Sequence, residues 1–247
     1  MTGFVEIHGL GKGVRAFYTE KSFPFVKGEE DYSVVELFCG IKRDRFVRAS
    51  QTHTSTIRTV TSAECGEGVV FPLKETDYDG MITDEKGTVL LTVEADCVPV
   101  YLYDVKKGVI GMVHSGWRGC AGEISANAVR EMVRNYGTDP CDVNAVIGPH
   151  ICDKCYEVGG ELIDEFSRHF SENEIKKCFS PKSDGKYLLN MSEAIKITLK
   201  KCGVLNITDT ETCTFCGDNL CSYRKTGDKK ARMLTGIFIE SSPKDKF

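Results

Sequence analysis

The clearest pattern in the chain is a set of short apolar runs in its centre, separated by polar residues and glycine-containing turns. Residues 88–93, 98–103 and 109–113 are rich in valine and other large apolar residues, and residues 143–147 form a similar run that ends at Gly-Pro. Apolar runs of this length, bounded by turn residues, are typical of buried β-strands. The pattern therefore predicts four strands in the centre of the chain.

Strands are also predicted on both sides of this centre. The first forty residues contain short apolar segments and glycine turns, with a charged turn at residues 27–31. The remaining strands are predicted at residues 46–49, continuing through 51–53, and at residues 56–60, 206–209 and 233–240.

Three segments show helical spacing instead. Across residues 121–136 apolar residues recur every four positions, and Gly137 follows as a helix C-cap. Further helices are predicted at residues 160–169 and 192–200. Strands and helices mix without strict βαβ alternation, which favours an α/β fold with a mixed sheet flanked by helices. No linker, repeat or charge block divides the sequence, so we expect one domain over residues 1–247.

Composition and charge exclude several classes of protein. Hydrophobic residues make up 41% of the 247 positions and charged residues 28%, which excludes disordered and collagen-like chains. No apolar run approaches the ~20 residues that cross a bilayer, so we expect no membrane partner. The 32 basic and 36 acidic residues are interspersed, which argues against a nucleic-acid partner. The first residues lack the apolar core of a secretory signal, so we expect a cytoplasmic protein.

The twelve cysteines are unusual for such a chain. We expect them to be reduced, and most of them to pack as small hydrophobic residues. Two pairs have the C-x-x-C spacing of zinc knuckles, and Cys221 follows five residues after the second pair: Cys152 with Cys155, and Cys213 with Cys216. The pairs lie farther apart than in a typical zinc ribbon. Packing is therefore the preferred interpretation, and a structural metal or redox site is the alternative.

The first candidate functional residue is His114, which ends an apolar strand directly before the loop 115–119. Gly116 and Gly119 allow a ligand to approach the backbone, and Arg118 can bind a carboxylate or phosphate through two hydrogen bonds. A strand end that faces a helix N-terminus also favours anions. The alternative is a tight strand–helix turn that carries a surface arginine.

Two further residues lie at strand ends. Cys97 stands at the break between two apolar strands, among acidic residues that are costly there unless they serve a site. His53 lies just past another predicted strand. Together with His114 they form a plausible catalytic zinc set, which keeps one coordination position open. A nucleophile–base pair of Cys97 and His114 fits the same pattern.

Several motifs in order resemble one family. They are residues 78–83 (YDGMIT), 95–100 (ADCVPV), 113–119 (VHSGWRG), 147–151 (IGPHI), 155–159 (CYEVG) and 222–224 (SYR). Over most of the chain, from about Gln51 to Phe238, the sequence resembles the bacterial laccase-domain family. Its members were first named polyphenol oxidases or multicopper oxidases, and more recently purine nucleoside phosphorylases.

The resemblance implies a mixed β-sheet sandwich flanked by helices, similar to cysteine-hydrolase-like toxin domains. It also implies Zn²⁺, rather than copper, on His53, Cys97 and His114. The implied activity is phosphorolysis of adenosine, inosine, guanosine and methylthioadenosine, with adenosine deamination as a side activity. The partners would be purine nucleosides and phosphate, and the protein a monomer or homodimer.

Roles for the surrounding residues follow from the same assignment. Arg118 would bind phosphate, and Gly116, Gly119 and Gln51 would lie around the substrate. Asp96 would relay a proton or support the metal ligands, as would Glu94. Four positions depart from the family pattern: Thr54, Cys152 and Ala231 replace glycine, and Glu94 replaces threonine.

Three alternatives remain. The first is a thiol hydrolase that uses Cys97 and His114, for example on cell-wall precursors. The second is a copper polyphenol oxidoreductase, for which five scattered histidines are too few to build several copper centres. The third is a cysteine-rich metal-binding interaction module, which leaves the Trp117–Arg118 loop unexplained.

Overall fold

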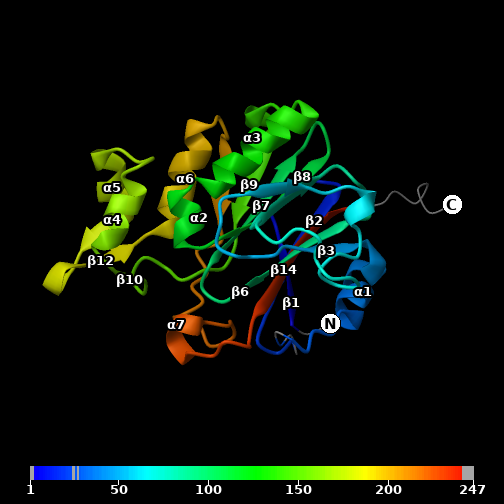
Figure 1. Cartoon of the computed structure of the whole chain (residues 1–247), viewed down its shortest axis with the longest axis horizontal. Coiled ribbons are helices and arrows are strands. Elements are labelled where there is room, and N and C mark those ends of the chain that lie inside the picture. The colour runs from blue at the N-terminus through cyan, green and yellow to red at the C-terminus, as the bar shows by residue number, and fades with distance from the viewer. Residues whose placement is uncertain (1–2, 24–25, 27, 241–247) are drawn as a thin grey trace.

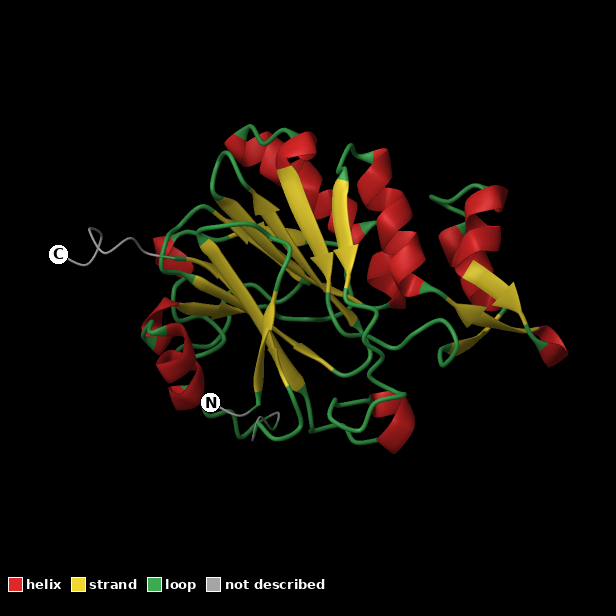
Figure 2. Cartoon of the chain, turned by 180° about the vertical axis from the view of Figure 1, so that it is seen from behind, coloured by secondary structure: helices red, strands yellow, loops and turns green. Residues whose placement is uncertain are grey.

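The computed structural model describes residues 3–23, 26 and 28–240. The predicted charged turn begins at Lys27, which lies outside the described residues. Two larger β-sheets face each other, helices cover their outer faces, and a small third sheet extends at one end of the molecule (Figures 1 and 2). The predicted mixed α/β class is therefore confirmed.

The first large sheet is mixed and has five strands. In spatial order they are β1 (Phe4–Ile7), β2 (Val14–Thr19), β14 (Met233–Ile239), β6 (Val89–Glu94) and β3 (Phe46–Arg48). All neighbouring pairs are antiparallel except β3 and β6, which are parallel. The sheet thus joins the first strands of the chain to the last described strand.

The second large sheet carries the residues that concern function. Its six strands, in spatial order, are β13 (Asn206–Asp209), β9 (Val143–Ile147), β7 (Val98–Asp104), β8 (Val109–Ser115), β5 (Gly80–Thr83) and β4 (Ile57–Thr59). In the antiparallel β7–β8 pair, Val98 lies opposite Ser115. The start of β7 and the end of β8 therefore meet at one edge of the sheet.

The small sheet has three strands, β10 (Glu157–Gly159), β12 (Lys186–Leu189) and β11 (Phe179–Pro181). The α-helices are α1 (Ser33–Cys39), α2 (Trp117–Ala121), α3 (Ile124–Tyr136), α4 (Glu161–Phe166), α5 (Glu172–Cys178), α6 (Met191–Lys201) and α7 (Tyr223–Thr226). Short 3₁₀ helices lie at Arg43–Arg45, Ser62–Glu64, Pro140–Asp142 and Ser183–Gly185. In the part of the chain that is described, no helix is long and apolar enough to span a membrane.

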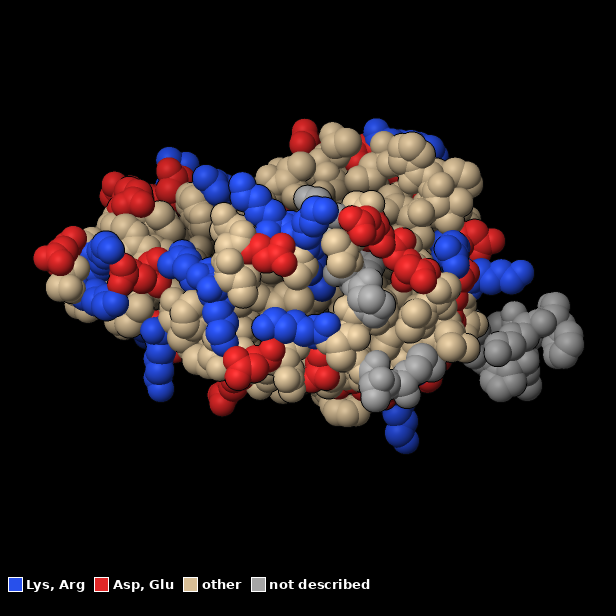
Figure 3. Space-filling view, turned by 90° about the horizontal axis from the view of Figure 1, so that it is seen from below, with Lys and Arg blue, Asp and Glu red and all other residues tan. Residues whose placement is uncertain are grey.

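The core fills the space between the two large sheets and beneath the helices. Leu90 and Ile237 of the first sheet pack with Tyr101 and Met112 of the second, and all four are fully buried. On the outer face of the second sheet, α3 and α6 bury their apolar sides, for example Val129. Burial of large apolar side chains contributes roughly 1.5–3 kcal/mol each. Figure 3 shows acidic and basic side chains interspersed over one face of the molecule.

The four central strands are confirmed, with ends that differ by one or two residues. The prediction that strand 46–49 continues through 51–53 is wrong, because Gln51 and His53 have φ angles of 59° and 64°. Such left-handed backbone does not occur inside a strand. The predicted helix 121–136 begins three residues later, as α3 at Ile124, because Glu123 has a left-handed φ of 56°. The predicted loop 115–119 is partly helical, since α2 begins at Trp117. Helices α1, α2, α5 and α7 and the small sheet were not predicted.

Candidate metal centre

His53, Cys97 and His114 meet at one edge of the six-stranded sheet. His53 lies in the loop between β3 and β4, Cys97 lies just before β7, and His114 lies near the end of β8. Their ligand atoms all lie within 4.8 Å of one another. The Sγ atom of Cys97 is 4.0 Å from Nε2 of His53, and the two imidazole rings are 5.1 Å apart. The structure therefore brings together the three residues of the predicted zinc set.

The buried carboxylate of Asp79 contacts both histidines of this centre. Its Oδ1 atom accepts hydrogen bonds from the backbone N–H of His53 at 3.0 Å and lies 2.7 Å from Nδ1 of His114. Its Oδ2 atom accepts from the N–H groups of Thr52 and Thr54, at 3.1 and 2.7 Å, and from the Thr54 hydroxyl. Because Nδ1 of His114 is engaged, Nε2 is the nitrogen left to bind a metal.

The loop that carries His53 has a strained backbone that other contacts hold in place. Gln51 and His53 both have positive φ angles, which cost about 1–3 kcal/mol each for such residues. The side chain of Gln51 pairs with the backbone of Val93, donating to its carbonyl at 2.7 Å and accepting from its N–H at 2.9 Å. Together with Asp79, this pairing holds the backbone from which the His53 side chain extends.

Gly116 closes the centre on its other side. A Cβ atom at this position would lie 2.9 Å from Cδ2 of His53 and 3.2 Å from Sγ of Cys97. Real Cβ atoms do not approach within 3.0 Å, so a side chain at this position would push the His53 ring away from Cys97. Glycine is therefore required here by the close approach of the backbone to the ligands.

The two histidines beside Cys97 favour the thiolate form of its side chain. Burial raises the pKa of the Cys97 thiol, but His114 and His53 outweigh this and lower it to about 6. Burial lowers the pKa of His114, whereas the neighbouring Glu94, Cys97 and Asp79 raise it well above its ordinary value. The thiolate is the form of cysteine that binds metals and attacks carbon.

Glu94 is a fully buried carboxyl group beside the centre. Its Oε2 atom lies 3.6 Å from Nε2 of His114, and neither oxygen has a hydrogen-bond partner. Burial raises its pKa to about 8. A buried polar group without a partner is costly. A buried carboxyl this close to Nε2 of His114 and to Cys97 fits a place where a cation is held.

A pocket of about 280 Å³ opens beside these residues. Its walls include three aromatic side chains and two arginines: Trp117, Tyr156, Tyr223, Arg118 and Arg224. The exposed Arg118 stacks its guanidinium 4.1 Å from the ring of Trp117. Arg224 lies over the ring of Tyr156 at 5.0 Å and donates to the carbonyl of Glu157. The pocket therefore offers apolar faces and positive charge next to the three ligands.

Comparison with protein-family models gives one match, the multi-copper polyphenol oxidoreductase laccase family, over residues 28–240. The chain belongs to this family. It is similar to the purine nucleoside phosphorylase YlmD of Geobacillus stearothermophilus, with 34% identity over 78% of this chain and 72% of that protein. It is also similar to the adenosine deaminase RL5 of an unknown prokaryotic organism, with 31% identity over 81% of this chain and 77% of that protein.

Two solved structures have the same fold as this chain. The hypothetical protein YfiH of Bacillus licheniformis matches with a TM-score of 0.89 and 30% identity, over 97% of both chains. The structure of YlmD from Geobacillus stearothermophilus matches with a TM-score of 0.85 and 27% identity, also over 97% of both chains. The resemblance stated from the sequence motifs is therefore confirmed.

Two departures from the laccase-family pattern lie at the centre itself. Thr54 replaces the expected glycine, and its hydroxyl donates to Asp79 at 2.9 Å, which adds a hydrogen bond to the carboxylate that orients His114. Glu94 replaces the expected threonine and supplies the unpaired buried carboxyl. Both departures leave His53, Cys97 and His114 in place.

The other predicted site residues have different positions. Asp96 lines the pocket, but its carboxylate accepts hydrogen bonds from the Thr214 hydroxyl at 2.7 Å and the Arg224 N–H at 2.6 Å. Its role in proton transfer stays a prediction. Gln51 and Gly119 are not among the residues that line the pocket. Gln51 orders the His53 loop instead.

Sequence reasoning did not assign a role to three residues that shape the site, Asp79, Tyr156 and Arg224. Each lies inside one of the motifs that carried the resemblance, at residues 78–83, 155–159 and 222–224. An acidic residue directly before an apolar strand was the available signal for Asp79.

Proposed function

We propose that this chain is an enzyme that cleaves purine nucleosides by phosphorolysis, at a Zn²⁺ site formed by His53, Cys97 and His114. The observation that carries the proposal is the meeting of these three ligands with a pocket that has two arginines and three aromatic walls. The relatives named purine nucleoside phosphorylase support the reaction.

The donor set fits zinc. One thiolate and two imidazoles are common zinc ligands, and three protein ligands leave a position that faces the pocket. When bound, Zn²⁺ supplies Lewis-acid polarisation of an oxygen atom. Among the described residues, this group contains only two histidines, whereas a multicopper centre needs many more. We therefore propose zinc rather than copper, in spite of the family's name.

Arg118 and Arg224 are the groups we assign to phosphate. Guanidinium groups bind phosphate oxygens through paired, charge-assisted hydrogen bonds. Held between them, an oxygen of hydrogen phosphate forms a bond to C1′ of the ribose, and the C1′–N9 bond breaks. The purine leaves with the bonding electrons and takes up the proton that the phosphate gives up. The products are the free base and ribose 1-phosphate. Positive charge on both arginines lowers the repulsion between phosphate and the electron-rich sugar oxygens.

The aromatic walls suit the purine. Trp117, Tyr156 and Tyr223 each present an aromatic side chain to the pocket. Stacking of a base on an aromatic ring contributes about 1–3 kcal/mol. Stacking accepts any purine, which agrees with a broad range of nucleosides: adenosine, inosine, guanosine and methylthioadenosine.

Deamination of adenosine is a second candidate activity, favoured by the similarity to the adenosine deaminase RL5. In that reaction water attacks C6 of adenine and ammonia leaves, while the glycosidic bond stays intact. We expect it to be slower than phosphorolysis.

Chromatography of adenosine incubated with the purified protein, with and without phosphate, tests the proposal. We expect adenine and ribose 1-phosphate only when phosphate is present, with slower formation of inosine. Equal release of adenine in both buffers would show simple hydrolysis instead. Unchanged adenosine in both buffers would refute the proposal, and activity that survives metal removal but not thiol alkylation would indicate a Cys97–His114 thiol hydrolase.

A further inference from the structure

Two cysteine pairs that are far apart in the sequence lie together in the fold. Cys152 and Cys155 lie in the loop after β9, and Cys213 and Cys216 lie in the loop after β13. Strands β9 and β13 are parallel neighbours, so the loops that follow them leave the sheet at the same edge. As a result, all four Sγ atoms lie within 4.8 Å of one another.

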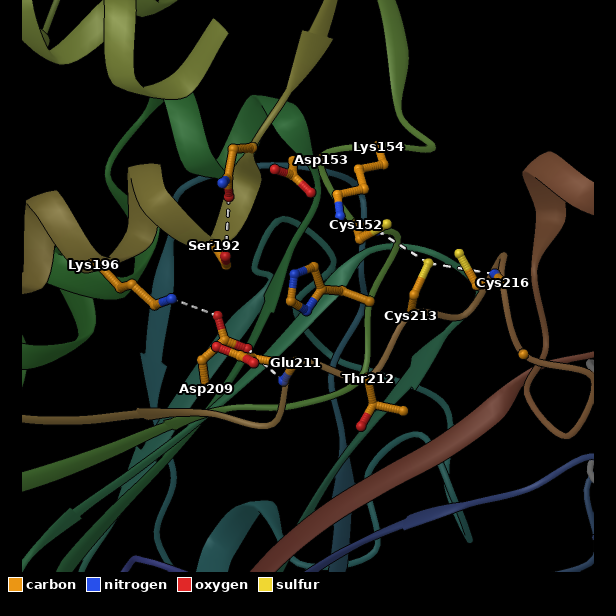
Figure 4. A pocket seen from close by; sticks show the side chains of 13 residues that line it. Cys152, Asp153, Lys154, Ser192, Lys196, Asp209, Glu211, Thr212, Cys213 and Cys216 are labelled. Atoms are coloured by element: carbon orange, nitrogen blue, oxygen red, sulfur yellow. Dashed lines mark hydrogen bonds and ion pairs between the residues drawn. The ribbon is translucent and has the colours of Figure 1, made fainter. Parts of the chain in front are cut away.

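The two loops have the local geometry of metal-binding knuckles. The backbone N–H groups of Cys152 and Cys216 donate hydrogen bonds to Sγ of Cys213, at 3.3 and 3.4 Å. Sγ of Cys155 is 3.3 Å from Sγ of Cys216. Figure 4 shows Cys213 between Cys152 and Cys216, with dashed lines to both. Backbone N–H groups aimed at sulfur stabilise a thiolate.

We propose that these four cysteines bind one Zn²⁺ in a closed, tetrahedral site, separate from the centre at His53, Cys97 and His114. On binding, the four thiols release four protons to solvent and form four zinc–sulfur bonds. Four thiolates are soft ligands, which select zinc over magnesium and calcium. With four protein ligands no position remains for a substrate, so the site is structural.

The surroundings allow an ion to reach the cluster. Three of its members, Cys152, Cys213 and Cys216, line a pocket of about 810 Å³ that is open to solvent, and Cys216 is exposed. Lys154 lines the same pocket and brings positive charge toward a cluster that carries four thiolates (Figure 4).

The proposed ion joins the two loops that hold one side of the candidate active site. Tyr156, which follows Cys155, lines the pocket beside Cys97. Thr214, which follows Cys213, donates its hydroxyl to Asp96 at 2.7 Å. Loss of the ion therefore releases contacts on the wall of the pocket, although the inference does not depend on which reaction occurs there.

Metal analysis of matched variants provides the first test. We expect two zinc ions per wild-type chain, one in the double variant Cys155→Ser/Cys216→Ser, and two in Cys141→Ser, which changes an exposed cysteine outside the cluster. The melting temperature of the double variant should fall by about 5–10 °C, and that of Cys141→Ser should stay unchanged.

The variant Cys97→Ala provides the second test, which does not require the double variant to fold. It leaves the four-cysteine cluster as the remaining zinc site, so X-ray absorption should show four sulfur ligands at about 2.3 Å. If wild type and Cys97→Ala both hold one such zinc, this inference stands and the proposed catalytic zinc fails. Absence of metal from Cys97→Ala, nitrogen ligands, the visible absorption of bound iron, or disulfides detected by mass spectrometry would each overturn it.

Discussion

The substitution Asp79→Asn tests how the fold builds the candidate metal centre. Oδ1 of Asp79 contacts His53 and His114, and Oδ2 contacts Thr52 and Thr54, so five donors converge on one buried carboxylate. Asparagine keeps one oxygen and places an NH₂ group where the other was. Because NH₂ cannot accept a hydrogen bond, at least two of the five contacts are lost in either orientation.

The size of the effect follows from those contacts. A hydrogen bond to a charged group contributes about 1.5–3 kcal/mol, so losing two lowers the free energy of unfolding by about 3–6 kcal/mol. At about 2–4 °C for each kcal/mol, the melting temperature should fall by about 6–24 °C. Loss of the carboxylate that orients His114 should also weaken zinc binding by about 10–100-fold.

Urea unfolding of the metal-free protein and zinc competition with a chelator measure the two effects separately. Asp77→Asn is the matched control, because Asp77 is exposed and the substitution makes the same change of charge two residues away. We expect the control to behave as wild type in both assays. An Asp79→Asn protein that unfolds at the wild-type urea concentration and binds zinc with wild-type affinity would refute the reasoning.

Three further predictions concern single side chains. Cys97→Ala should lose the zinc of the candidate catalytic centre, while the urea midpoints of the metal-free variant and metal-free wild type should agree; two zinc ions still bound to the variant would refute the assignment. Arg118→Ala should keep zinc but raise the KM for phosphate by about 10–100-fold, whereas unchanged phosphate kinetics would make Arg118 a surface residue. Burial raises the pKa of Glu67, but hydrogen bonds from Arg58 and Lys74 outweigh this and lower it. Glu67→Gln should therefore cost about 2–3 kcal/mol at pH 7 in urea unfolding. The difference should shrink as the pH falls below the ordinary pKa of glutamate and through the lower pKa of folded Glu67, and a difference independent of pH would contradict this.

The central strands could be predicted because each is a short apolar run. The length of such a run and the spacing of its apolar residues can be read from the local sequence. The error at residues 51–53 has a non-local cause. The backbone there is left-handed because Asp79, more than twenty residues later, accepts the N–H groups of Thr52 and His53. Similarly, Glu123 breaks the predicted helix where Asn127 donates to the carbonyls of Ser55 and Gly122. No local pattern contains these contacts.

The sequence placed the candidate metal ligands at strand ends, but it could not show that these strand ends lie side by side. This arrangement depends on the order of strands in the sheet, with β7 antiparallel to both β8 and β9. This order places the starts of β5 and β7 and the ends of β8, β9 and β13 at one edge. The same order brings the two cysteine pairs together, although their separation in sequence favoured unrelated thiols.

Asp96 links Cys97 of the candidate catalytic centre to the two loops that carry the four cysteines. It directly precedes Cys97, its carbonyl accepts the N–H of Ile151 at 3.1 Å, and its carboxylate accepts the hydroxyl of Thr214. Ile151 and Thr214 belong to the two loops that the four cysteines join. With a φ of 90°, Asp96 adopts this backbone only because these contacts hold it. The structural ion would thus fix the residue beside Cys97, so the four-cysteine site stabilises the geometry of the candidate active site as well as the loops around it.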